Sequence, residues 1–105
     1  MKIPARAAQD AQPILLPEYE LLEEAEINLR FGHDKLAEEV LKEAIKINPK
    51  NPHAYLILLR IYVAREDTAA FLAVGQRLKL LGDESAWKKA AEMGRKLDPD
   101  NQLYR

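Results

Sequence analysis

The sequence predicts an all-α protein of about five helices, in which two helical hairpins are followed by a C-terminal helix. The clearest signal lies in residues 32–49, where apolar side chains between Leu36 and Ile47 recur at helical spacing and define one buried face. Asn48-Pro49 predicts the end of this helix, because proline disfavours helical geometry in the residue before it. Asn51 and Pro52 then predict a new helix, with asparagine as its cap and proline at its first position.

The first three helices are expected from their composition and boundaries. The first should span about residues 18–31, with glutamates near the N-terminal end that the helix dipole makes positive. Such a charge run predicts a solvated face, made by Glu18, Glu20, Glu23 and Glu24. Asp34 should cap the second helix, since its carboxylate can accept amide groups of the first turn. The third helix, about residues 52–64, is apolar nearly all round and should therefore be the most buried one.

The last two helices have clear start and stop signals. The fourth should span about residues 68–81, with Asp67 as its cap and Gly82 beyond its end. The fifth should span about residues 85–97 and cover the fourth as a lid. We expect Trp87 to anchor this lid, since the alanines and glycine on neighbouring turns permit close approach to the fourth helix.

Composition limits the class of protein. The chain has 105 residues, enough for one small domain, and its net charge of −1 predicts no general attraction to nucleic acid or anionic membranes. There is no cysteine, which excludes disulfides and thiolate chemistry. No apolar run approaches the roughly 18 residues of a membrane span, and the N-terminus lacks the apolar core of a signal peptide. A cytoplasmic location is therefore expected.

Residues 1–16 are expected to form a flexible N-terminal arm, and residues 17–105 a single helical domain. Within Pro13–Pro17, the triplet Ile14-Leu15-Leu16 is too apolar for a solvated linker. It would either cover the outer face of the first helix or dock into a groove of another molecule.

The second predicted helix resembles the second helix of a tetratricopeptide repeat. Ala37, Leu41 and Ala44 match the small, large and small positions that precede the proline of that family, here Pro49. With a family period of about 34 residues, the repeats would be about 18–51 and 52–84. The resemblance implies a right-handed superhelix in which short side chains such as Ala44 let two helices approach closely.

The second copy of this pattern departs from the family. Phe71 stands where the first copy has Ala37, and Gly75 stands where it has Leu41. Large and small residues are thus exchanged, which could preserve the total volume while changing the local packing.

Residues 18–105 resemble, more particularly, the internal repeat region of FimV-type proteins. The most specific matching segment is Trp87–Asn101, which reads WKKAAEMGRKLDPDN. The other matching positions are Glu24–Ile27, Gly32, Leu36–Ala44, Leu58–Tyr62 and Ala70-Phe71. FimV-type proteins are bacterial inner-membrane proteins linked to type IV pilus assembly, twitching motility and polar organisation. The resemblance implies a soluble cytoplasmic fragment of such a protein, with pilus-assembly or polar proteins as partners.

Motifs that would carry chemistry are scarce. His33 and His53 are the only histidines, and neither has a second ligand at metal spacing. Ser85 is interpreted as a helix cap rather than a nucleophile, and the isolated glycines form no phosphate-binding loop. The basic residues of the fifth helix have no aromatic residues between them, so this pattern is only weak evidence for RNA binding. We therefore expect no catalytic site, cofactor or metal.

Function should then reside in a surface, and in stacked helix pairs the first helix of each repeat lines the concave side. The expected groove residues are Tyr19, Leu22, Glu26, Leu29, Arg30, His53, Leu56, Arg60, Val63 and Ala64. Arg30 and Arg60 would pair with carboxylates of a bound protein or peptide segment. Equally, these residues could contact neighbouring repeats or the Pro13–Pro17 arm. Apart from the groove, the chain could also associate with itself.

Two function classes follow. The first is a non-catalytic protein–protein interaction module of a FimV-like protein. The alternative is a helical accessory domain of a larger enzyme, such as a transferase.

Overall fold

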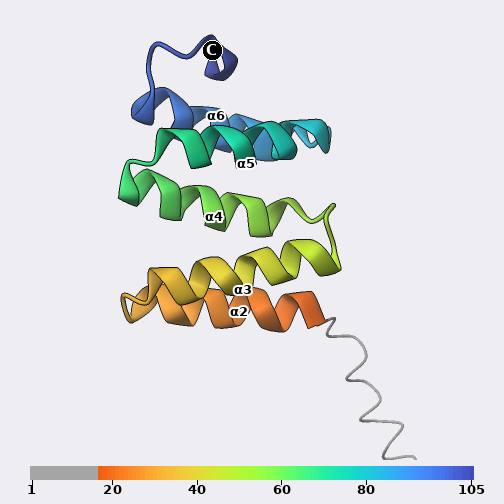
Figure 1. The fold of residues 1–105 in the computed structure, drawn as a ribbon. Helices are drawn as coiled ribbons and strands as arrows, with labels where there is room; N and C mark the ends of the chain where they lie inside the picture. Colours follow the sequence, from red (N-terminus) through yellow and green to blue (C-terminus); the bar gives the residue numbers. More distant parts are fainter. Residues whose placement is uncertain (1–16) are drawn as a thin grey trace, which may run out of the picture.

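The computed structural model describes residues 17–105, and over this range it contains α-helices and one short 3₁₀ helix but no strand (Figure 1). The elements are α2 (Pro17–Arg30), α3 (Asp34–Ile47), α4 (Pro52–Arg65), α5 (Thr68–Leu80), α6 (Glu84–Leu97) and η2 (Gln102–Tyr104). An all-α fold of about five helices is thus confirmed. The expected arm, with its apolar triplet, lies outside the described residues.

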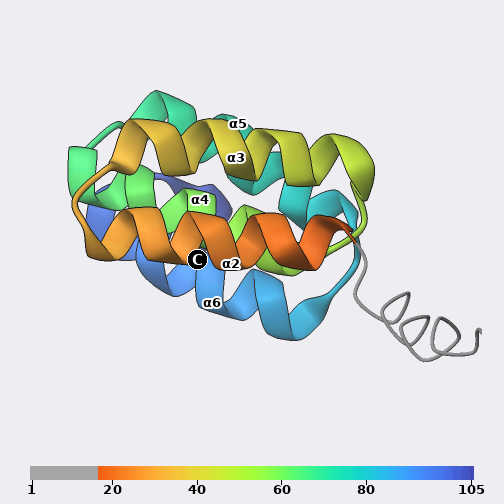
Figure 2. The same ribbon diagram turned by 90° about the horizontal axis from the view of Figure 1, so that it is seen from below.

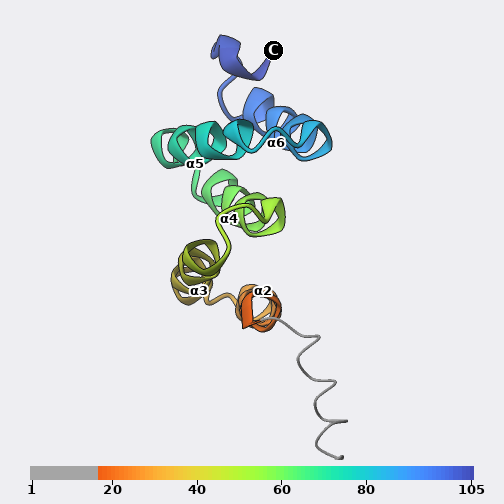
Figure 3. The same ribbon diagram turned by 90° about the vertical axis from the view of Figure 1, so that its right-hand side faces the viewer.

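The helices stack in a zigzag. Figure 3 shows α2, α4 and α6 on one side of the stack and α3 and α5 on the other. Successive helices pack against each other, and α6 packs against both α4 and α5. Seen from below, α2 and α3 lie side by side at one end of the stack (Figure 2). The helix α6 therefore covers α5, and it also stands where the first helix of a third hairpin would stand.

The predicted helix caps are confirmed at Asn51 and Asp67, each of which immediately precedes a helix. The side chain of Asn51 accepts a hydrogen bond from the His53 amide at 3.0 Å, and Asp67 accepts one from the Ala70 amide at 3.0 Å. The expectation for Asp34 was wrong, since it is the first helical residue of α3 and makes no cap hydrogen bond.

The cap of the last helix also differs from the expectation. Asp83 rather than Ser85 caps α6, accepting a hydrogen bond from the Ala86 amide at 3.0 Å. Gly82, with φ of +79°, provides the left-handed turn between α5 and α6.

The core is centred on α4. Leu58 and Leu59 are almost fully buried, as are two aromatic rings of the same helix, Tyr55 and Tyr62. Ala44 is also buried in α3, which fits its expected place at a close helix contact.

The exchange of large and small residues in α5 has a packing reason. A Cβ atom placed on Gly75 would meet the Phe71 ring at 3.9 Å and the Trp87 ring at 4.0 Å. Because Gly75 has no side chain, the half-buried Trp87 of α6 can pack closely against α5 at this point. Phe71 is fully buried.

The 3₁₀ helix η2 contributes an aromatic side chain that the sequence did not indicate. Tyr104 is only 1% exposed and lies edge-on to Phe71, with ring centroids 5.5 Å apart. Its ring covers Gly94 of α6, because a Cβ atom there would lie 2.5 Å from the ring. Arg95 donates a hydrogen bond to the Tyr104 carbonyl at 2.7 Å and holds η2 in place.

Candidate functional site

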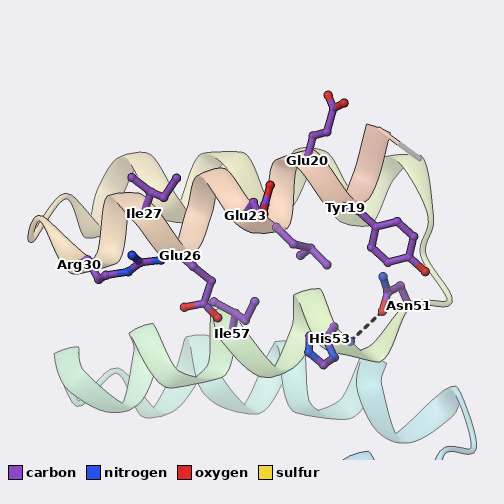
Figure 4. Close-up of a pocket in the computed structure, with 10 residues that line it drawn as sticks. Tyr19, Glu20, Glu23, Glu26, Ile27, Arg30, Asn51, His53 and Ile57 are labelled. Atoms are coloured by element: carbon purple, nitrogen blue, oxygen red, sulfur yellow. Dashed lines mark hydrogen bonds between the residues drawn. The ribbon is translucent and has the colours of Figure 1, made fainter. Parts of the chain in front are cut away.

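A groove of 760 Å³ runs between α2 and α4, the first helices of the two hairpins (Figure 4). It is lined by Tyr19, Glu20, Leu22, Glu23, Glu26, Ile27, Arg30, Asn51, His53 and Ile57. Tyr19 points toward the Asn51 end of α4, and Glu26 points toward Ile57, whereas Ile27 points away from α4 (Figure 4). The groove therefore has an apolar floor and a charged rim.

The residues predicted from the sequence divide into three groups. Half of them line this groove, namely Tyr19, Leu22, Glu26, Arg30 and His53. Three others line a second cavity of 440 Å³ at the far end of α4, namely Leu29, Arg60 and Ala64. Leu56 and Val63 are half-buried against the core and line neither cavity.

Sequence reasoning missed half of the groove lining, namely Glu20, Glu23, Ile27, Asn51 and Ile57. Helix α4 is apolar nearly all round, so its periodicity does not distinguish the groove side from the core side. Ile57 was thus missed in favour of its neighbour Leu56. Asn51 was recognised only as a cap, although its side chain also reaches α2.

The charges of the groove differ from the expectation. Arg60 is not free, because its guanidinium lies 3.4 Å from the Glu26 carboxylate across the groove, with the two side chains 54% and 40% exposed. The lining contains Glu20 and Glu23 in addition, against a single lining arginine, Arg30. The expected pair of carboxylate-binding arginines is therefore reduced to Arg30, and the lining carries an excess of negative charge.

Glu18 fixes one end of the groove and is buried, at 4% exposure, contrary to the solvated face expected for the first turn. Its carboxyl oxygens accept hydrogen bonds from the Asn48 amide at 2.9 and 3.0 Å and from the Asn51 amide at 2.7 Å. Both asparagine side chains also accept a backbone amide, from Lys50 and His53. This Glu18 cluster links α2 to the turn between α3 and α4.

A second polar cluster, here called the Arg65 cluster, links α3 to the other end of α4. Arg65 donates to Asp34 at 2.8 Å and to Glu38 at 2.7 Å, and Tyr62 donates to Glu38 at 2.7 Å. The Nη2 atom of Arg65 also lies 2.7 Å from Asp34, as an ion pair without hydrogen-bond geometry. Asp34 was expected to cap α3, and it instead pairs with this arginine.

The Arg65 cluster strongly perturbs its acidic member. Burial acts to raise the pKa of Glu38, but hydrogen bonds from Tyr62 and Arg65, together with Lys42, outweigh it and lower this pKa to about 2. Burial and the same hydrogen bond raise the pKa of Tyr62, and the two carboxylates raise the pKa of Arg65. Glu38 is thus held ionised as the acceptor of three donors.

Stability should fall in acid through Glu38. Its pKa is about 2 in the folded protein against an ordinary 4.5, so this contribution is complete above pH 4.5 and is lost as the pH falls toward 2. We expect a loss of roughly 2 kcal/mol over that interval, measured by urea unfolding at each pH. Glu38→Gln should flatten this part of the profile. A profile as steep as that of the wild-type protein would assign the acid sensitivity to another group.

Residues 17–105 offer neither a metal site nor a membrane-spanning helix. No group of three or more histidine, cysteine, aspartate or glutamate side chains in this part of the chain is arranged to hold a metal ion. None of its helices has both the length and the apolarity needed to cross a membrane. Comparison with protein-family models, curated proteins and solved structures likewise yields no match.

Proposed function

We propose that this chain is a non-catalytic protein–protein interaction module that holds a segment of its partner in the groove between α2 and α4. The observation that carries the proposal is the groove itself, which exposes an aromatic ring, Tyr19, beside the apolar Leu22 and Ile57. Concave surfaces with exposed apolar side chains and a polar rim are typical of peptide-binding sites.

The charges of the lining favour a basic partner. Glu26 is already paired with Arg60, while Glu20 and Glu23 have no ion-pair partner among residues 17–105. A segment with an apolar side chain for Tyr19 and a lysine or arginine for these glutamates would satisfy both features. Arg30, at the far end of the lining, would donate hydrogen bonds to a carboxylate of the same segment.

The wider setting that we propose is a FimV-like protein acting in type IV pilus assembly, twitching motility or polar organisation, with this module in the cytoplasm. The support is the resemblance of Trp87–Asn101 to the repeat region of those proteins. Three residues of this segment have packing roles, since Trp87 fills the space beside Gly75, Gly94 lies under Tyr104, and Asn101 caps η2.

Opposite charge reversals on the two sides of the groove test the proposal. A photo-crosslinking residue at position 19 would capture the partner from a bacterial lysate, and peptides from the crosslinked region would then be titrated by calorimetry. Glu23→Lys should weaken binding about fivefold, because it removes attraction for a basic segment. Arg60→Glu should preserve or increase affinity, because it frees the groove residue Glu26 from its ion pair and adds negative charge beside it.

The control is Glu66→Lys, which makes the same charge change outside the groove lining and should leave binding unchanged. If Arg60→Glu weakens binding and Glu23→Lys does not, the partner is acidic and the charge assignment is wrong. If no segment crosslinks from position 19, the groove is not the binding surface.

A further inference from the structure

The outer face of the α2–α3 hairpin, at the end of the stack, carries an unusual set of exposed apolar side chains. Four of the six large apolar residues exposed in residues 17–105 lie on this hairpin beyond Tyr19, and Phe31 is the most exposed of the four, at 72%. They are Ile27, Phe31, Leu36 and Ile47. Four exposed glutamates lie on the same hairpin, namely Glu20, Glu24, Glu39 and Glu43. We call these eight residues the head face.

Helix geometry places the head face away from α4. In α3, Asp34 and Glu38 face α4 through Arg65, and positions 36, 39, 43 and 47 lie on the opposite side of the helix, since each residue advances about 100°. In α2, Glu26 faces Arg60 of α4. The head-face positions of α2 lie more than 90° around the helix axis from Glu26. The head face is therefore separate from the groove floor, although Glu20 and Ile27 lie on the rim common to both.

The opposite end of the stack carries a pocket of the opposite charge. This pocket of 460 Å³ lies between the end of α5, α6 and η2, with the rings of Trp87 and Tyr104 in its wall. Four basic side chains line it, namely Lys79, Lys88, Arg95 and Arg105. Only Asp83 and Glu84 oppose them, so the lining of this tail pocket has a net positive charge.

We propose that this chain associates with a second copy of itself head to tail, so that the head face of one molecule docks on the tail pocket of the next. The surfaces are complementary in two ways: glutamates meet lysines and arginines, and the exposed Phe31 ring meets a pocket walled by aromatic rings. The α2–α3 hairpin and the α6–η2 segment lie at opposite ends of the stack (Figures 1 and 3). A contact between the head face and the tail pocket is therefore heterologous and can continue from one molecule to the next.

The same charges disfavour the symmetric alternatives. Two head faces in contact would oppose four glutamates to four glutamates, and two tail pockets would oppose lysines to lysines. Association through these ends should therefore weaken as salt is added, because salt screens the attraction between head and tail.

Charge reversal at each end tests the proposal. Sedimentation equilibrium of the full chain over a concentration series should give a weight-average mass that rises with concentration in about 0.05 M salt and falls toward the monomer in about 0.5 M salt. Glu24→Lys/Glu43→Lys, at the head, should abolish this rise. Lys79→Glu/Lys88→Glu, at the tail, should abolish it too. An equimolar mixture of the two variants should associate again, because one supplies a native tail and the other a native head.

Lys50→Glu is the matched control, since it reverses one charge in the exposed turn between α3 and α4 and should leave association unchanged. Far-UV circular dichroism checks that each variant remains folded. A wild-type mass that stays monomeric at every concentration in low salt would overturn the proposal. Association that survives in the tail variant would also overturn it, because that result indicates a symmetric head-to-head contact.

Discussion

Replacing Tyr104 by alanine is expected to lower the free energy of unfolding by about 3–5 kcal/mol, the range for removing a large aromatic side chain from a core. Tyr104 lies only seven residues beyond α6, yet its ring is almost fully buried against Phe71, Trp87 and Gly94. Truncation removes those contacts and leaves the end of the stack open to water. Thermal or urea unfolding followed by circular dichroism measures the loss.

Two further variants test the hydroxyl group of Tyr104 and the position of its ring. Tyr104→Phe keeps the ring and should cost much less than the alanine variant. Gly94→Ala should cost about 1–3 kcal/mol, because the new Cβ atom would lie 2.5–2.7 Å from ring atoms of Tyr104 and must displace the ring. If Gly94→Ala is as stable as the wild-type protein, the Tyr104 ring does not lie on this helix.

Replacing Glu18 by alanine is expected to cost about 2–3 kcal/mol, an unusually large effect for a glutamate in the first turn of a helix. The substitution removes three hydrogen bonds and leaves the amide groups of Asn48 and Asn51 without their acceptor. Because Asn51 also caps α4, the start of that helix should loosen as well. Urea unfolding gives the energy, and hydrogen exchange of the α4 amides reports the loosening.

Glu20→Ala is the matched control, because Glu20 lies in the same first turn but is exposed. It should change the free energy of unfolding by less than about 0.5 kcal/mol. Equal effects of the two substitutions would mean that the helix dipole, rather than the asparagine contacts, accounts for the contribution of Glu18.

The helices were predictable because their signals are local. Asn48-Pro49 and Gly82 end helices through backbone geometry that the chain carries whatever its surroundings. Asn51 and Asp67 cap helices through atoms two or three residues away. The helical spacing of apolar side chains in α3 also predicted which face of this helix is buried.

The polar contacts were not predictable, since they join residues distant in the sequence. Glu18 lies in a glutamate-rich first turn, which is typical of a solvated face. Its burial follows from hydrogen bonds with Asn48 and Asn51, which the fold brings to it from about 30 residues later in the chain. Asp34 has the sequence position of a helix cap, but its carboxylate instead accepts a hydrogen bond from Arg65, 31 residues later in the chain.

The site was only partly predictable for the same reason. A free Arg60 was inferred from one helix, and its pairing with Glu26 needs two helices side by side. In the apolar helix α4 several registers fit equally well, so Ile57 and Leu56 could not be distinguished by pattern.

The two polar clusters also determine where the groove is restrained. The Glu18 cluster and the Arg65 cluster attach the α2–α3 hairpin to opposite ends of α4. Between them, the exposed Glu26–Arg60 pair, worth less than about 1 kcal/mol, is the one ionic restraint between α2 and α4 in residues 17–105. The middle of the groove therefore has the weakest polar restraint, and we expect its width there to adapt to the thickness of the segment it receives.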